Sequence, residues 1–271
     1  MGHDVAVVIG VGGMGRAIAR RIGGGRRLLL ADFDKENLDS VVEVLTGEGH
    51  EVFGRQVDVS DAGSVAALAA AAAEAGRVTH IAHTAGVSPT QAVTKAVFEV
   101  DLLGTALVLD AFEGVVAEGG AGVAIASMSA YMVPLPDDQV AALAHTPAAD
   151  LLALPFLDHD AHPGLAYSVA KRGNIARVQA SAVGWGQHGA RLNSISPGVI
   201  STPMGRQELD GESGASMRAM VAASATGRLG TPDDIAHAAA FLLDPATSFV
   251  TGIDLLVDGG TVAGVRALTT G

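Results

Sequence analysis

The stretch Val7-Val8-Ile9-Gly10-Val11-Gly12-Gly13-Met14-Gly15-Arg16-Ala17-Ile18-Ala19 decides the fold. It joins an apolar run, a glycine-rich turn and a segment of helical period. Gly10, Gly12 and Gly15 fit the pattern G-x-G-x-x-G, which gains meaning where a strand turns directly into a helix. A pyrophosphate approaches backbone N–H groups there so closely that a Cβ would block it, and the helix N-terminus adds partial positive charge. The stretch therefore predicts a dinucleotide-binding loop.

Beyond this loop, short aliphatic runs alternate with longer Ala-rich segments of helical period, which is typical of βαβ units. The runs predicted as strands are 5–9, 28–31, 52–57, 78–83, 123–127, 191–195 and 253–257. The segments predicted as helices are 14–22, 35–46, 61–75, 94–116, 167–187 and 233–243. Asp61 and Ser64 are both plausible caps of the third helix, and Pro232 is placed as a first-turn residue of the last. Near-continuous apolarity indicates strands covered on both faces. We expect one α/β domain over 1–271, a doubly wound Rossmann fold whose central parallel sheet has about seven strands and helices on both faces.

Two segments depart from this alternation. Residues 131–163 contain five of the ten prolines and a Leu-rich stretch after Pro147, which opens a short predicted helix. Residues 203–226 are polar, with Gly, Ser and Met. Because lids over active sites commonly come from such excursions, we expect an insertion at 131–163 that lines one wall of the pocket and a substrate lid at 203–226.

The composition excludes several classes of protein. The chain has 271 residues, no cysteine and a formal net charge of −12. A negative surface repels phosphate backbones and anionic lipid, so we expect neither nucleic acid nor a membrane as a partner. The absence of cysteine excludes disulfides, thiolate zinc sites and a cysteine nucleophile. No targeting or membrane-spanning segment is visible, so we expect a cytoplasmic protein.

Asp32 is the candidate residue for cofactor choice. It ends the second predicted strand, 17 residues after Gly15. A carboxylate at this position accepts hydrogen bonds from the ribose hydroxyls of the adenosine and repels a 2′-phosphate. No Lys or Arg follows it directly, so NAD is expected rather than NADP.

At this point the residues resemble the short-chain dehydrogenase/reductase family over nearly the whole chain. Tyr167-Ser168-Val169-Ala170-Lys171 matches its Tyr-x-x-x-Lys signature, and Ser127-Met128-Ser129 lies where the family keeps a catalytic serine. The register favours Ser129 over Ser127. The resemblance implies the catalytic set Ser129, Tyr167, Lys171 and Asp101. It also implies these cofactor-binding residues: Gly10, Gly12, Gly13, Met14, Gly15, Asp32, Asp58, Val59, Thr84, Ala85, Gly86, Tyr167, Lys171, Pro197, Gly198, Val199, Ile200 and Thr202.

The chain departs from the family pattern at three places. Its glycine loop is one residue shorter, with Ile9 where the family has Thr. The Asn of the family's catalytic tetrad falls on Asp101, whose carboxylate, if it lies near Lys171, would partly offset the pull of that lysine on Tyr167. Ser129 and Tyr167 are 38 positions apart, further than is usual in the family.

The residues predict proton transfer at Tyr167. Tyr167 and Lys171 are four positions apart and share one face of a helix. A free Tyr, with a pKa of about 10, is a poor base at neutral pH, and a nearby ammonium favours its ionised form. We therefore predict an NAD-dependent oxidoreductase that interconverts a secondary alcohol and a ketone, with Ser129 holding the substrate oxygen. The apolar segments 151–157 and 217–223 suggest a hydrophobic carbonyl such as a steroid.

Two other functions stay open. Asp101 and His83 are compatible with a nucleotide-binding protein of this fold with little or no turnover. A methyltransferase also has a glycine loop and an acidic residue after its second strand, but gives Tyr-x-x-x-Lys no role. We expect no metal site, since Asp158, His159, Asp160 and His162 lack regular ligand spacing. The resemblance implies a homotetramer or a homodimer, with the helices at 94–116 and 167–187 as interface.

Overall fold

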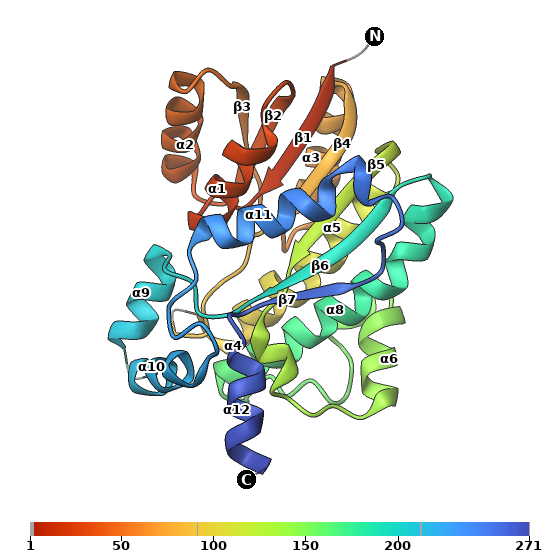
Figure 1. Cartoon of the computed structure of the whole chain (residues 1–271). Helices are drawn as coiled ribbons and strands as arrows, with labels where there is room; N and C mark the ends of the chain where they lie inside the picture. The colour runs from red at the N-terminus through yellow and green to blue at the C-terminus, as the bar shows by residue number, and fades with distance from the viewer. Residues whose placement is uncertain (1–2, 91, 212, 271) are drawn as a thin grey trace.

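A single parallel sheet organises the chain (Figure 1). The computed structural model describes residues 3–90, 92–211 and 213–270. The strands are β1 (Asp4–Ile9), β2 (Arg27–Asp32), β3 (Glu51–Gln56), β4 (Arg77–His83), β5 (Val116–Ile125), β6 (Arg191–Pro197) and β7 (Asp254–Val257). Their order is β3-β2-β1-β4-β5-β6-β7, and every pair is parallel. The predicted doubly wound fold is confirmed.

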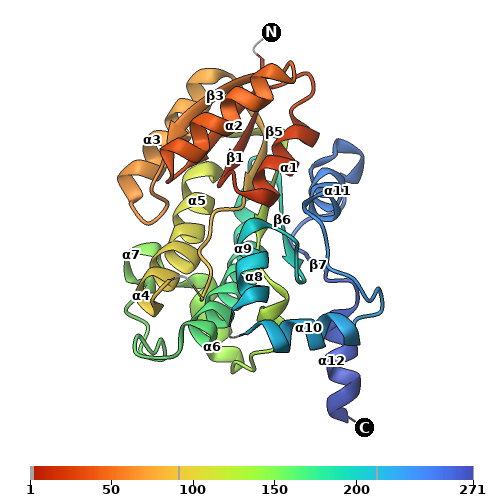
Figure 2. The same cartoon turned by 90° about the vertical axis from the view of Figure 1, so that its left-hand side faces the viewer.

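Helices cover both faces of the sheet and bury two separate cores (Figure 2). On one face lie α1 (Gly13–Ile22), α2 (Lys35–Gly47) and α11 (Pro232–Leu243), whose buried residues include Ile18, Leu38 and Ile235. On the other face lie α3 (Ala62–Ala75), α5 (Gly104–Glu113) and α8 (Pro163–Gln187), with Leu68 and Trp185 in the core. Double coverage explains why the central strands are apolar without alternation.

The helix predicted at 94–116 is broken in the structure. It begins as α4 (Thr94–Val97), continues through a π-helical turn (Phe98–Leu103) and becomes α5. β5 then starts at Val116, earlier than the predicted start at 123. The sequence pattern missed the first half of this strand because Gly119 and Gly120 interrupt its apolar run. Turns of the π type recur at functional sites, and this one contains Asp101.

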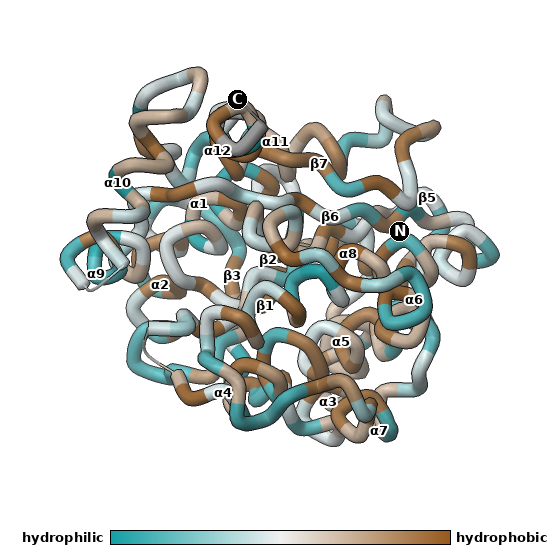
Figure 3. Tube along the Cα trace, turned by 90° about the horizontal axis from the view of Figure 1, so that it is seen from below, coloured by the Kyte–Doolittle hydropathy of each residue, from teal (hydrophilic) through white to brown (hydrophobic). Residues whose placement is uncertain are grey.

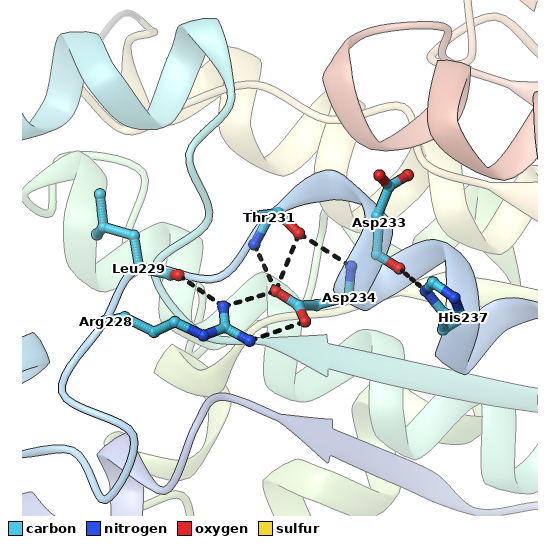
Figure 4. Close-up of polar contacts among 6 residues, drawn as sticks. All are labelled: Arg228, Leu229, Thr231, Asp233, Asp234 and His237. Atoms are coloured by element: carbon cyan, nitrogen blue, oxygen red, sulfur yellow. Dashed lines mark hydrogen bonds and ion pairs between the residues drawn. The ribbon is translucent and has the colours of Figure 1, made fainter.

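The start of α11 matches the sequence signal at Pro232 (Figure 4). Thr231 caps the helix: its hydroxyl accepts from the backbone N–H of Asp234, whose carboxylate accepts from the backbone N–H of Thr231. Arg228 donates two hydrogen bonds to the same carboxylate and, with Thr231, lowers the pKa of Asp234. This network fastens the chain that follows the predicted lid. Asp61 likewise caps α3 by accepting from the backbone N–H of Ser64.

The remaining elements lie around the carboxyl edge of the sheet, which faces the viewer in Figure 3. They are α6 (Asp137–His145), α7 (Ala148–Leu151), α9 (Pro203–Asp210), α10 (Gly214–Ala223), α12 (Thr261–Thr270) and the 3-10 turn Met128–Tyr131. A second 3-10 turn, Pro245–Thr247, lies at the amino edge, between α11 and the start of β7. In this view α6 and α7 lie on the side opposite α9 and α10. The two segments predicted as excursions therefore occupy different places.

The insertion packs against α8. Leu143, Leu151 and Leu157 are buried in one cluster with Phe98 and Leu102 of the π-helical turn. α6 thus covers part of a helix that was expected to form an oligomer interface, and the oligomeric state stays a prediction. None of the described helices is long and apolar enough to cross a membrane.

Candidate active site

A cavity of about 860 Å³ opens at the carboxyl edge of the sheet, beside the point where the strand order reverses between β1 and β4. Ligands of open α/β sheets bind at such a switch point. Every predicted site residue lines this cavity: Gly10, Gly12, Gly13, Met14, Gly15, Asp32, Asp58, Val59, Thr84, Ala85, Gly86, Asp101, Ser129, Tyr167, Lys171, Pro197, Gly198, Val199, Ile200 and Thr202. The structure therefore brings the scattered motifs together in one place.

The glycine loop lies at one end of the cavity and is pinned to the end of β4. Gly10 has a φ of +88°, and its carbonyl accepts from the Thr84 hydroxyl at 2.5 Å. A Cβ on Gly15 would overlap the Gly10 carbonyl oxygen, so the third glycine is needed for close packing. Gly12 precedes α1 without any side-chain cap, so the first turn keeps N–H groups without intrahelical acceptors. Such a turn fits a pyrophosphate.

Two carboxylates are held at the same end. The Oδ2 atom of Asp32 accepts from the backbone N–H of Val11 at 2.7 Å, and its Oδ1 atom accepts from that of Asp34 at 2.9 Å. Asp58 accepts from the backbone N–H and the hydroxyl of Ser60. Asp32 therefore stabilises the glycine loop and still faces the cavity.

A buried ion pair lies deeper in the cavity. The Lys171 Nζ atom is 2.9 Å from Oδ1 of Asp101, and the two side chains are 5% and 0% exposed. Nζ also donates to the carbonyl of Ile125 at 3.4 Å, while Oδ2 of Asp101 accepts from the backbone N–H of Val87 at 3.3 Å. Burial alone would lower the pKa of Lys171, but its attraction to Asp101 outweighs this and raises it. The charge of the lysine is thus balanced within the protein.

Tyr167 lies beside this pair. The Lys171 Nζ atom is 5.2 Å from the centre of the Tyr167 ring. Loss of water around its hydroxyl raises the pKa of Tyr167, and Lys171 opposes this effect. Asp101 acts against the lysine and raises that pKa again. The environment therefore holds Tyr167 protonated to higher pH than a lone lysine would.

The comparisons with known proteins agree with this geometry. The family model described as enoyl-(acyl carrier protein) reductase matches residues 10–146 and 159–262. A short-chain dehydrogenase/reductase of Alternaria brassicicola is 38% identical over 97% of both chains. The chain belongs to the short-chain dehydrogenase/reductase family.

Further similarities extend over the whole fold. The D-threitol dehydrogenase of Mycolicibacterium smegmatis is 33% identical over 94% of this chain and 92% of its own. A crystal structure from Brucella melitensis, described as a short-chain dehydrogenase/reductase of the glucose/ribitol dehydrogenase type, has a TM-score of 0.76 at 26% identity, covering 96% of this chain and 99% of its own. Dehydrogenases of this family use a nicotinamide cofactor, NAD or NADP.

Of the two candidate serines in this family member, the geometry favours Ser127 over Ser129. β5 ends at Ile125, and Ser127 is the extended residue before the 3-10 turn. A hydrogen bond from the Ser127 side chain lowers the pKa of Tyr167. The Ser129 hydroxyl is buried within the turn and has no partner among the described residues. Ser127 therefore replaces Ser129 as the serine of the centre proposed below.

Three other residues, His83, Tyr131 and His162, have structural roles. His83 is buried at the end of β4, where its Nε2 atom is 3.2 Å from the Thr105 hydroxyl, and burial lowers its pKa to about 3. Tyr131 donates to Asp254 at 2.6 Å, outside the cavity. His162 accepts from the backbone N–H of Gly164 and so caps α8. Among the described residues, no group of three His, Asp or Glu side chains could hold a metal ion.

No residue of 131–163 is among the residues that line the cavity. The leucines of the insertion pack in one cluster with the π-helical turn, and Tyr167 packs against that cluster. That the insertion forms one wall of the substrate site stays a prediction. The segment 203–226 does line the cavity, and it contributes residues that the motif search did not single out: Pro203, Met204, Gly205, Glu208, Ser213, Met217 and Met220. The sequence signal for this segment was its departure from the strand–helix alternation, together with the apolar run 217–223 for Met217 and Met220.

Proposed function

We propose that this protein is an NAD-dependent oxidoreductase that interconverts a secondary alcohol and a ketone through a Ser127-Tyr167-Lys171 centre. The observation that carries the proposal is the convergence of three features on one cavity. These are an uncapped glycine turn, a tyrosine beside a buried lysine, and a serine whose side chain lowers the pKa of that tyrosine. The two named dehydrogenases among its relatives support an alcohol as substrate.

Each side chain has a defined task in this reaction. Tyr167 removes the hydroxyl proton of the alcohol, or returns it to the oxygen during reduction. Ser127 donates a hydrogen bond to the same oxygen and polarises the carbonyl. Lys171 favours the ionised phenol through its positive charge. A nicotinamide cofactor held by the glycine loop and by Asp32 supplies or accepts the hydride.

The direct test is turnover. Purified protein with NAD and a panel of cyclic and acyclic secondary alcohols should produce absorbance of the reduced nicotinamide. The alternative is a nucleotide-binding protein with little or no turnover, which the balanced charge of Lys171 favours. Tight NAD binding without any absorbance change across the panel, in both directions, would decide for that alternative.

The first prediction concerns cofactor choice. NAD should bind at least about tenfold, or ~1.4 kcal/mol, more tightly than NADP, because the fixed Asp32 carboxylate repels a 2′-phosphate. The Asp32→Asn variant should narrow this ratio, since it keeps an acceptor but removes the charge. Asp34→Asn is the matched control, because Asp34 is a neighbouring acid whose side chain caps α2. Calorimetric titration measures the affinities of all three proteins for NAD and for NADP, and equal binding of NAD and NADP to the unmodified protein would refute the assignment.

The second prediction concerns pH. Asp101 raises the pKa of Tyr167, and oxidation requires Tyr167 to be deprotonated. Asp101→Asn should therefore lower that pKa and move the rising limb of kcat against pH to lower pH. Glu99→Gln is the control, since Glu99 lies in the same π-helical turn but pairs with the exposed Lys95. An unshifted limb in Asp101→Asn would show that the carboxylate does not act on Tyr167.

We also propose a substrate with an apolar body, such as a steroid or another hydrophobic carbonyl compound. Met204, Met217 and Met220 support this, since methionine side chains adapt to irregular apolar shapes. A homotetramer or homodimer, expected from the resemblance, remains part of the proposal.

A further inference from the structure

Glu208 differs from the other acidic residues that line the cavity. Asp32 and Asp58 are held at the glycine-loop end, and Asp101 is paired with Lys171. Glu208 instead comes from α9, in the segment that borders the substrate end beside Met204. No described Lys or Arg forms an ion pair with Glu208. Its carboxylate is thus an unbalanced charge in this part of the cavity.

A hydrogen bond fixes the carboxylate of Glu208. The Ser88 hydroxyl donates to Oε1 of Glu208 at 2.5 Å, and Ser88 is 1% exposed. Ser88 lies in the loop after β4, and its oxygen also accepts from the backbone N–H of Thr90 at 3.2 Å. The contact therefore joins α9 to the loop after β4, whose Pro89 and Thr90 also line the cavity, and holds the acid in place. Because ordering an otherwise flexible side chain costs entropy, a preformed position favours recognition over chance contact.

The charge of Glu208 reaches the proposed reacting centre. Glu208 is one of the groups that raise the pKa of Tyr167, so its field extends to that hydroxyl. Lys171 is the one cationic side chain among the described lining residues, and Asp101 already balances it. The protein therefore provides no positive charge to neutralise an acidic substrate at this end.

We infer that Glu208 determines substrate specificity, accepting a hydrogen bond from a second donor on the substrate and rejecting substrates with an anionic group. The inference rests on the proposed function and refines its substrate class. It indicates a neutral alcohol or ketone with an apolar body and a further hydroxyl away from the reacting carbon. A carboxylate or phosphate on the substrate would face like-charge repulsion and would lack a cationic partner.

Three ring compounds of similar size test the inference: cyclohexanol, trans-1,4-cyclohexanediol and trans-4-hydroxycyclohexanecarboxylate. Their binding to the protein is measured by calorimetry with and without NAD, and turnover is measured in parallel. We expect the unmodified protein to bind the diol at least threefold more tightly than cyclohexanol, and at least tenfold more tightly than the carboxylate. In Glu208→Gln the carboxylate should gain about tenfold in affinity, or ~1.4 kcal/mol.

Ser88→Ala is the matched control. Glu208→Gln removes the charge but keeps an oxygen that can accept from Ser88, whereas Ser88→Ala removes the contact and keeps the charge. Discrimination against the carboxylate should therefore survive in Ser88→Ala and weaken in Glu208→Gln. Equal effects of the two variants would assign Glu208 a structural role only and overturn the inference. So would binding of the carboxylate as tight as that of the diol, or no measurable binding of the diol.

The binding and turnover measurements separate two kinds of failure. If no compound is oxidised but Glu208→Gln still changes the binding ratio as expected, the proposed reaction fails and the specificity role stands. If the alcohols are oxidised, and the affinity for the diol relative to that for the carboxylate is unchanged in Glu208→Gln, the reaction stands and the specificity role fails.

Discussion

Tyr167→Phe should lower kcat by about 10²–10⁴-fold on any confirmed substrate, the range that a positioned acid–base group contributes. The substitution deletes the hydroxyl that transfers the proton and leaves the ring, which packs partly against the cluster formed with the insertion. NAD affinity should stay nearly unchanged. Initial rates at the nicotinamide absorbance, together with calorimetric NAD titration, measure the two effects separately.

The two serines of the turn provide the control for this result. Ser127→Ala should reduce kcat in the same direction, because it removes the hydroxyl that lowers the pKa of Tyr167 and that, in the proposed reaction, donates to the substrate oxygen. Ser129→Ala should have a small effect on kcat, since the Ser129 hydroxyl has no partner among the described residues. If Tyr167→Phe keeps a near-normal kcat, the assigned proton carrier is wrong. A large loss in Ser129→Ala with none in Ser127→Ala would restore the register expected from the sequence.

Local sequence signals predicted the fold and most of the site for physical reasons that act over short distances. A pyrophosphate turn needs Gly10 and Gly15 at fixed spacing, because backbone φ and close packing exclude a Cβ. Tyr167 and Lys171 share a helix face because they are four positions apart. Both requirements act between residues that are close in the chain, so the spacing of these residues in the sequence is enough to predict them.

The features of the site that could not be predicted from the sequence depend on tertiary packing. Whether Ser127 or Ser129 faces Tyr167 depends on where β5 ends, and its glycines blur that boundary. Similarly, the leucines of the insertion have the same periodicity whether they line a pocket or pack behind α8. Glu208 lies in a segment without a recognisable motif, and it became a candidate only when α9 was placed over the cavity.

The buried pair of Lys171 and Asp101 leads to the other large expected effect. A single buried charge without its partner typically costs 3–5 kcal/mol of folding free energy. Lys171→Met should therefore lower the free energy of unfolding by about that amount near pH 8, because Asp101 is left 0% exposed without a cation. It should also lower kcat, since the proposed function gives the lysine charge a role at Tyr167, and NAD affinity, since the family resemblance implies that Lys171 also binds the cofactor.

The pH dependence of this loss has a defined sign. Burial raises the pKa of Asp101 above that of the unfolded chain, and Lys171 is the main group that opposes this. Without the lysine, Asp101 stays protonated in the folded state at pH values above about 4, where an Asp in the unfolded chain has already lost its proton. Stability of Lys171→Met should thus fall as the pH rises above about 4, and approach that of the unmodified protein in acid. Urea unfolding at fixed protein concentration, followed by circular dichroism from pH 5 to 9, measures this slope.

A double variant separates stability from activity at this pair. Asp101→Asn combined with Lys171→Met leaves no buried charge, so most of the lost unfolding free energy should return while kcat stays low. Lys95→Met is the surface control. Lys95 forms an ion pair with Glu99, four residues away, but its side chain is 78% exposed. Its loss should therefore lower the free energy of unfolding by less than about 1 kcal/mol. If the single and double variants are equally unstable, the burial of an unpaired Asp101 charge is not the cause of the lost stability. Recovery of kcat in the double variant would instead show that Lys171 acts only by neutralising Asp101, and that Tyr167 needs no cation to ionise.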